Sequence, residues 1–152
     1  HMSVDELDTL FNKRSGMMGL TGFGDLREVH RLVEEGNEDA KLALDIYVHR
    51  IVGYIGNYTA QMGGVDVITF TAGVGENDDV VRKMVCDKLA PFGVKLDEEK
   101  NATRSKEPRI ISTPDSAVTI CVIPTNEELA IARKSAAIAE EGKDSYGNVF
   151  SK

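Results

Sequence analysis

The sequence predicts a single α/β domain, and three observations support this. Its 152 residues are enough for one hydrophobic core but too few for two ordinary domains. Hydrophobic residues make up 41% and charged residues 28%, which is typical of a soluble globular protein. The second half reads in the order strand, glycine-rich turn, helix, strand, strand, helix, which is an α/β order. No apolar run approaches membrane-spanning length, so we expect no membrane contact.

Three amphipathic helices are predicted in the first half, at residues 3–12, 26–35 and 38–62. The first begins with Ser3 and has Glu6 three places on, which is the pattern of a capping box. Asp25 and Asn37 are the expected N-caps of the other two. Residues 14–24 hold four glycines and are predicted to form a loop.

In the second half, residues 65–70 are rich in β-branched side chains and predict a buried strand before a turn at 71–77. A helix is expected to begin at Asp78 or Asp79. A weak strand is predicted at 94–96, and a short helix is expected after it. Strands are also predicted at 109–112 and 118–123, and Thr125 is the expected cap of a closing helix from 126 to about 140. We assign residues 3–140 to the domain and 141–152 to a polar tail.

Charge and cysteine content exclude several classes of protein. Eighteen Lys and Arg against 25 Asp and Glu give a net charge of −7 without a local basic stripe, so we expect no nucleic-acid partner. Cys86 and Cys121 lack CxxC spacing and are predicted to be reduced thiols. We interpret His1-Met2 as a vector scar and find no signal peptide, so the expected location is cytoplasmic.

Two strand-to-helix junctions are the strongest candidate sites. Gly73–Asn77 follows a strand, and such a turn directs backbone N–H groups at an anion such as a nucleotide phosphate. Glu127 follows another strand, and a carboxylate there could hold Mg²⁺ against phosphate. The alternatives are a tight connection without a ligand at the first junction and a capping charge at the second.

A third candidate is Asp25–Arg27, beside the glycine-rich segment, where the two charged side chains could contact a nucleotide, although a plain helix cap explains Asp25 equally well. His30 and His49 lack ligand-spaced partners, so we interpret them as solvated or core residues. Tyrosines recur on the long predicted helix and indicate packing or a subunit interface.

Three segments, taken in order and at similar spacing, resemble the carboxyl-terminal domain of acetate kinase. They are residues 12–22 (NKRSGMMGLTG), 70–77 (FTAGVGEN) and 123–129 (IPTNEEL). The resemblance runs from about Ser3 to Glu140. It implies the ribonuclease-H-like fold of the acetate and sugar kinase, Hsp70 and actin superfamily, a mixed sheet flanked by helices.

The resemblance also implies a function and its site residues. Acetate kinases transfer the γ-phosphoryl group of ATP to acetate, reversibly and with Mg²⁺, giving acetyl phosphate and ADP. Glu127 matches the magnesium-associated glutamate. The residues that match nucleotide-binding segments are Asp25, Leu26, Arg27, Gly73, Val74, Gly75, Glu76 and Asn77.

The same resemblance implies what this chain lacks. In acetate kinases the phosphate-neutralising arginines, a catalytic aspartate and a histidine lie upstream of the matching segment, so we expect no catalytic residue here. Acetate would bind through that missing amino-terminal half, and this domain would form a homodimer. Alternatives are a propionate or butyrate kinase fragment, and a non-catalytic nucleotide-binding or dimerisation module.

Overall fold

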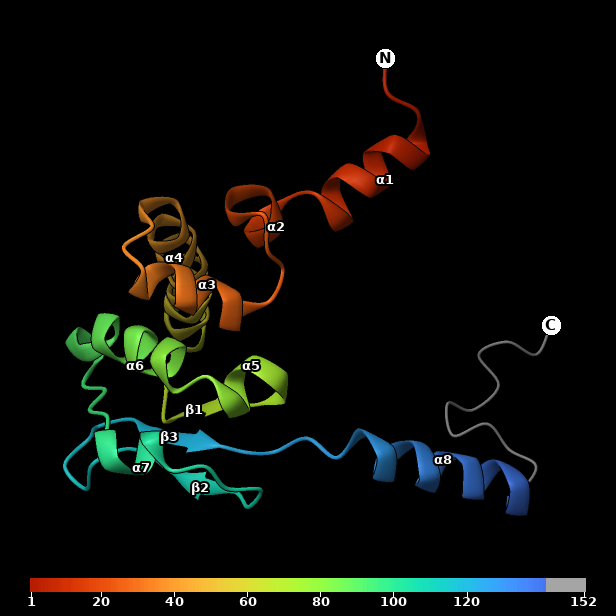
Figure 1. Ribbon diagram of the computed structural model, residues 1–152. Coiled ribbons are helices and arrows are strands. Elements are labelled where there is room, and N and C mark those ends of the chain that lie inside the picture. The colour runs from red at the N-terminus through yellow and green to blue at the C-terminus, as the bar shows by residue number, and fades with distance from the viewer. Residues whose placement is uncertain (142–152) are drawn as a thin grey trace.

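The computed structural model describes residues 1–141, so all but the first residue of the predicted tail lies outside the described residues (Figure 1). Four helices precede the first strand, and helices and strands are mixed in the rest of the described chain. The helices are α1 (Val4–Lys13), α2 (Gly16–Thr21), α3 (Leu26–Glu34), α4 (Glu38–Met62), α5 (Ala72–Asn77), α6 (Asp79–Lys88), the 3₁₀ turn η1 (Ala90–Phe92), α7 (Glu98–Ala102) and α8 (Glu127–Glu141). The strands are β1 (Val67–Phe70), β2 (Arg109–Ile110) and β3 (Thr119–Val122).

Capping explains why the first helices begin where the sequence predicts. Ser3 and Glu6 form a full capping box at the start of α1. The side chain of Asp25 accepts a hydrogen bond from the amide of Arg27, and Asn37 accepts one from the amide of Ala40 at 2.9 Å. The three predicted helices are therefore confirmed, with α3 one residue shorter than expected.

The predicted loop at 14–24 is wrong in part, because it contains α2. Gly16 and Gly22 have φ angles of 61° and 78°, values open to glycine, and they let the chain enter and leave this one short helix. Between them α2 packs against α4, and Met17 contacts the core. The four glycines of this segment favoured a loop, and the contact of α2 with α4 is tertiary and could not be read from the local sequence.

The sheet has the order β1-β3-β2, with β1 parallel and β2 antiparallel to β3. Because β1 and β3 are parallel neighbours, their carboxyl ends lie at the same edge of the sheet. The strand predicted at 94–96 is reduced to one bridge between Leu96 and Ser112. Strand β2 is likewise shorter than predicted.

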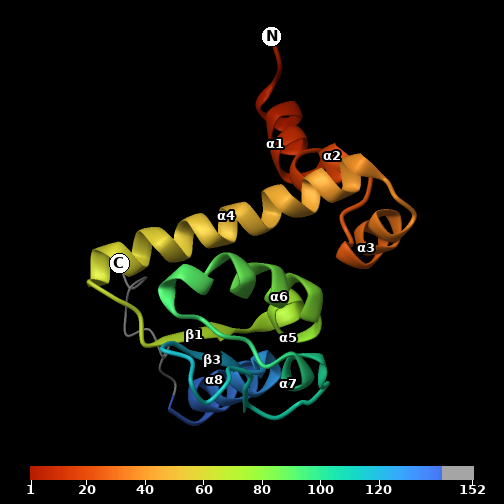
Figure 2. The ribbon, with the colours of Figure 1, turned by 90° about the vertical axis from the view of Figure 1, so that its left-hand side faces the viewer.

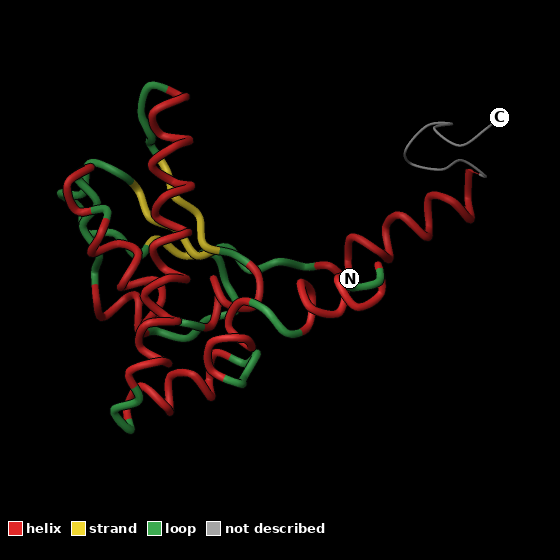
Figure 3. The backbone as a smooth tube through the Cα atoms, turned by 90° about the horizontal axis from the view of Figure 1, so that it is seen from above, coloured by secondary structure: helices red, strands yellow, loops and turns green. Residues whose placement is uncertain are grey.

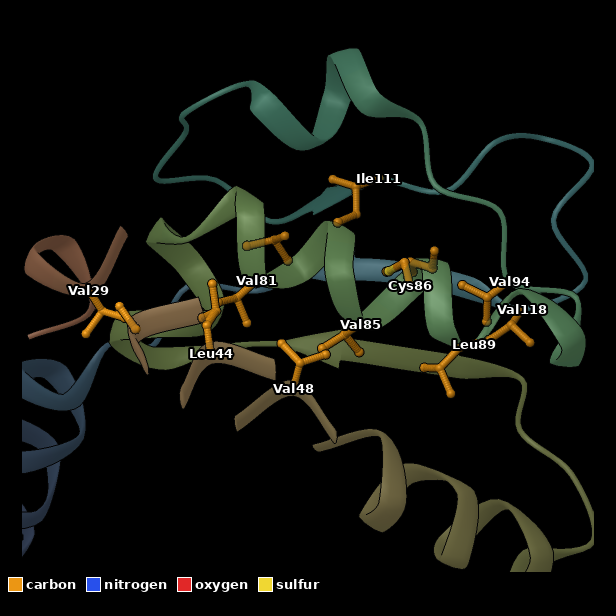
Figure 4. Packing of buried hydrophobic residues seen from close by; sticks show 13 residues of the cluster. Val29, Leu44, Val48, Val81, Val85, Cys86, Leu89, Val94, Ile111 and Val118 are labelled. Carbon is orange, nitrogen blue, oxygen red and sulfur yellow. The ribbon is translucent and has the colours of Figure 1, made fainter. Parts of the chain in front are cut away.

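Helix α6 lies between the sheet and α4 (Figures 1 and 2). Val48 of α4 and Val85 of α6 are completely buried in the core between these layers (Figure 4). Ile120 of β3 is also completely buried and belongs to the same cluster. Cys86 is also buried there, and burial raises the pKa of its thiol to about 12. Cys121 is half-buried, and neither cysteine is in a disulfide.

The two faces of the sheet differ. Ile120 and Val122 on the face toward α6 are fully buried, whereas Val67 of β1 is 53% exposed on the other face. The prediction of a buried strand at 65–70 is therefore wrong in part, because two of the four residues of β1 are exposed and the other two are half-buried. Helices α1 and α8 extend away from the core (Figures 1 and 3).

Candidate functional site

A pocket of about 1120 Å³ opens between the start of α3 and the region of α5 and α6. Asp25, Leu26 and Arg27 line one wall, which we call the α3 wall. The opposite wall, the α5 wall, is formed by Gly73, Val74 and Asn77. Two predicted segments more than 40 positions apart in the sequence thus face one cavity, whose size suits a small-molecule ligand.

The α3 wall is held by an exposed ion pair. Asp25 caps α3 and also contacts the Arg27 guanidinium, with Oδ2 2.5 Å from Nη2. This contact lowers the pKa of Asp25 to about 2, and the Asp25 carboxylate raises the pKa of Arg27. The Arg27 side chain is 89% exposed, so its positive charge stands at the mouth of the pocket.

The α5 wall is a short helix where the sequence predicted a turn. Ala72 begins it with a φ of 59°, in the left-handed region that costs a non-glycine residue about 1 to 2 kcal/mol. The Asn77 side-chain amide, at the end of the helix, donates to the Gly73 carbonyl near its start at 2.8 Å. Strained backbone of this kind clusters at functional sites, so Ala72 is consistent with one here.

Gly75 and Glu76 belong to the same segment but do not line the pocket. A Cβ on Gly75 would stand 3.2 Å from the Phe70 carbonyl carbon, so this glycine allows α5 to pack on the end of β1. Glu76 faces the next junction instead. Its Oε1 accepts hydrogen bonds from the backbone amide of Thr125 at 2.8 Å and from its hydroxyl at 3.1 Å, and the amide bond lowers the pKa of Glu76.

The junction after β1 and the junction after β3 are therefore joined by the hydrogen bonds between Glu76 and Thr125. The parallel pairing of β1 and β3 places the two junctions side by side. Thr125 was predicted to cap the last helix, and that prediction is wrong. The cap of α8 is Asn126, whose Oδ1 accepts from the Leu129 amide at 2.9 Å. Thr125 is not the cap because α8 begins at Glu127, which puts Asn126 in the N-cap position, and the Thr125 hydroxyl donates to Glu76 instead.

Glu127 opens α8 as an exposed residue and does not line the pocket. Within residues 1–141 no group of three or more His, Cys, Asp or Glu side chains could hold a metal ion. Mg²⁺ usually needs only one or two carboxylates, together with phosphate oxygens and water. A single carboxylate outside the pocket lining does not by itself form a metal site, and the role of Glu127 as a magnesium ligand stays a prediction.

Arg82 is a residue that the sequence analysis missed. Its side chain is 2% exposed, and its guanidinium donates to the carbonyls of Gly75 at 2.9 Å and Glu76 at 3.0 Å. It also donates to the side chain and the carbonyl of Asn101, both at 2.7 Å. Arg82 thereby anchors the end of α5 in the core. The sequence signal that could have identified it is a cation placed beside the apolar positions Val81 and Val85 of one helix face.

His30, set aside as a solvated or core histidine, lies in the pocket wall. Its Nε2 is 2.7 Å from Oδ2 of Asp78, the N-cap of α6. Tyr47 of α4 also lines the pocket, and burial raises its pKa. Arg104, exposed beyond α7, adds a second cation to the lining. Only the folded chain brings these side chains together, because they come from four separate segments.

Comparison with known proteins identifies the class to which this fold and pocket belong. The structure matches the crystal structure of Porphyromonas gingivalis acetate kinase with a TM-score of 0.81 and 41% identity, over 91% of this chain and 35% of that one. It matches a propionate kinase from Francisella tularensis with a TM-score of 0.78 and 39% identity, over 87% of this chain and 33% of that one. The fold is thus of the acetate-kinase type.

The sequence supports the same assignment. The profile of the acetokinase family matches residues 1–133. An acetate kinase of Leifsonia xyli subsp. xyli is 54% identical over 134 residues, which are 88% of this chain and 34% of that protein. This chain belongs to the acetokinase family. It spans about a third of the length of the curated relatives that it matches.

No helix within residues 1–141 has both the length and the hydropathy needed to cross a membrane.

Proposed function

We propose that this chain binds ATP or ADP with Mg²⁺ in the pocket between the α3 and α5 walls. The observation that carries the proposal is the convergence of Asp25–Arg27 with Gly73, Val74 and Asn77 on one cavity. Arg27 and Arg104 supply positive charge at the lining, where a polyphosphate would need it. Glu127 is the residue that we propose as a ligand of the magnesium ion, and a bound ion would supply neutralisation of the phosphate charge.

The complete protein, in this proposal, transfers the γ-phosphoryl group of ATP to acetate and works in the cytoplasm. Phosphoryl transfer depends mainly on positioning and charge stabilisation, and one arginine aimed at the transition state can be worth about 10³-fold or more. Because the resemblance to acetate kinases implies that the catalytic side chains lie upstream of this segment, we expect the 152 residues alone to bind nucleotide and to be nearly inactive. A coupled assay of acetate-dependent ATP turnover tests this, and a rate typical of kinases would contradict it.

Calorimetric titration with Mg-ADP tests the nucleotide site directly. Wild type should bind, weakly if the absent part of the protein normally closes the cleft. Gly75→Asp should abolish binding, because the new side chain meets the Phe70 backbone and adds negative charge beside the α5 wall. Circular dichroism should show that the variant stays folded. A folded wild-type chain that gives no heat with Mg-ADP would count against the proposal.

A propionate kinase remains the second candidate, because the Francisella tularensis structure fits nearly as well as the acetate kinases. One methylene changes discrimination by only about 1 to 3 kcal/mol, and the acyl pocket would lie mainly in the absent part. Relative turnover of acetate, propionate and butyrate by the complete protein would decide. A non-catalytic nucleotide-binding module is the third candidate, favoured if no such activity appears.

We further propose that the complete protein forms a homodimer through this domain. On α4, Tyr54 and Tyr58 are more than half exposed and stack with ring centroids 6.4 Å apart. The Arg50 guanidinium lies 5.1 Å from the Tyr54 ring. Exposed aromatic and arginine side chains of this kind are enriched in protein interfaces. Sedimentation should give a dimer mass, and a monomer mass would contradict the proposal.

A further inference from the structure

A side-chain hydrogen bond crosses between the two walls of the pocket. His30 lies on α3, and its Nε2 is 2.7 Å from Oδ2 of Asp78, which directly follows α5. The two side chains are only 21% and 12% exposed, and both line the pocket. Among the described residues it is the only side-chain hydrogen bond between α3 and the segment 72–79.

The two oxygens of Asp78 have separate partners. Oδ1 accepts from the Val81 amide at 2.9 Å and so caps α6. Since an ionised carboxylate only accepts hydrogen bonds, the ring N–H of His30 must donate to Oδ2. The capping bond fixes the orientation of the Asp78 side chain, so Oδ2 is held in one position as the hydrogen-bond acceptor for His30. A bond to a charged acceptor that is largely shielded from water is stronger than an exposed one.

This bond complements the packing of α3. On its core side, α3 is held by Val29, which is fully buried and contributes to the hydrophobic cluster. On its pocket side, Asp25 and Arg27 bond to each other and to the backbone of the same turn, not to the α5 wall. His30 is thus the side chain through which α3 is tied to the opposite wall.

We propose that His30 and Asp78 are a positioning pair that sets the spacing between Arg27 and Gly73 and so tunes nucleotide affinity. This inference rests on the proposed nucleotide function. Neither residue needs to touch the ligand, and the effect is exerted through the two walls. A site that is already spaced for its ligand loses less free energy on binding than one that must be ordered first.

The test uses the 152-residue chain, Mg-ADP calorimetry and amide NMR shifts of Arg27 and Gly73 without ligand. His30→Leu should raise the Kd by about tenfold, which is within the usual coupling range of contacting residues. His30→Gln keeps a donor near the Nε2 position and should stay within about threefold of wild type. Asp78→Ser keeps a good N-cap but is too short to reach His30, so its Kd should match that of His30→Leu.

The double variant His30→Leu with Asp78→Ser should bind no more weakly than either single variant, because both remove one interaction. His49→Leu, an exposed histidine on α4, is the matched control and should change nothing. Wild-type affinity in His30→Leu, or equal losses in the Leu and Gln variants at unchanged thermal midpoints, would overturn the proposal. Additive losses in the double variant would also overturn it.

The proposed function and this inference can fail separately. If the wild-type chain does not bind Mg-ADP, the nucleotide function fails, and the amide shifts alone decide whether the pair positions the walls. Shifts at Arg27 and Gly73 that change in His30→Leu and revert in His30→Gln support positioning, whereas unchanged shifts overturn it. If wild type binds and His30→Leu binds equally well, the function stands and the pair has no part in it.

Discussion

The α5 wall and the α3 wall of the pocket are held by different physical means. Arg82, buried beneath the α5 wall, binds the carbonyls of Gly75 and Glu76 and also Asn101. The α3 wall carries its charges on Asp25 and Arg27, a pair that is largely in water. Exposed ion pairs contribute little to stability, whereas buried polar networks contribute strongly when complete. The comparison indicates that a buried polar network holds the α5 wall, whereas the charges of the α3 wall are held by an exposed ion pair.

The largest expected effect comes from breaking the anchor of the α5 wall. Arg82→Met keeps much of the side-chain volume but leaves the carbonyls of Gly75, Glu76 and Asn101 without their donor. Leaving buried acceptors without a charged partner costs several times the free energy of an ordinary hydrogen bond. Urea unfolding should therefore show a decrease of about 3 kcal/mol in the free energy of unfolding. Arg104→Met, at an exposed arginine, should stay within about 0.5 kcal/mol. Equal stabilities would contradict the anchoring role of Arg82.

A smaller effect is expected from the glycines of the same wall. Gly75→Ala places a methyl group 3.2 Å from the Phe70 backbone, and overpacking of this kind outweighs the gain in helix propensity, for a net loss of about 1 kcal/mol. Gly73→Ala meets no atom within 4 Å and should be neutral or stabilising by up to about 1 kcal/mol. Thermal unfolding of the two variants checks this order, and the reverse order would refute the packing argument.

Substitution in the α3 wall should change nucleotide affinity much more than the stability of the fold. Arg27→Ala removes an exposed cation from the mouth of the pocket, so the unfolding midpoint should fall only slightly, through the lost contact with Asp25, while the Kd for Mg-ADP rises by about tenfold. Lys41→Ala, at an exposed cation outside the pocket, should alter neither quantity. A fall in stability without a change in Kd would show that Arg27 serves α3 and not a ligand.

The smallest effect concerns pH. The pKa of Asp25 is about 2 in the folded chain and 3.8 for the free group, so its contribution to stability is complete above about pH 4 and is lost as the pH falls through about 2. NMR titration of the Asp25 carboxyl carbon should show the low pKa. Arg27→Ala should raise it, because the guanidinium is its main cause. An unchanged titration in the variant would contradict that cause.

Local signals predicted most of the fold. Ser3, Asp25 and Asn37 cap helices where their short polar side chains predicted, and the β-branched run at 65–70 contains β1. The failures occur where tertiary contacts override local pattern. Thr125 has a good capping side chain, yet the helix is capped by Asn126, and the Thr125 hydroxyl donates to Glu76, 49 positions away in the sequence. No local pattern predicts such a contact.

Several residues of the pocket lining were singled out for the same reason, and their role in binding stays a prediction. Motif residues such as Gly73 and Arg27 can be identified from their own segments, and the structure places both on the pocket. Arg82 and the pair of His30 with Asp78 depend on partners distant in sequence, so periodicity gave them no role. Such supporting residues become visible only when the segments are assembled.

The uncovered face of the sheet has a practical consequence for the chain in solution. Val67 and Ile110 are more than half exposed, and β1 pairs with β3 along one edge only within the described residues. Unpaired backbone groups beside apolar side chains form a template to which another strand can add. Because β1 has only four residues, strand addition to it should be limited. We still expect turbidity and thioflavin fluorescence to rise with protein concentration. Val67→Lys should suppress both signals.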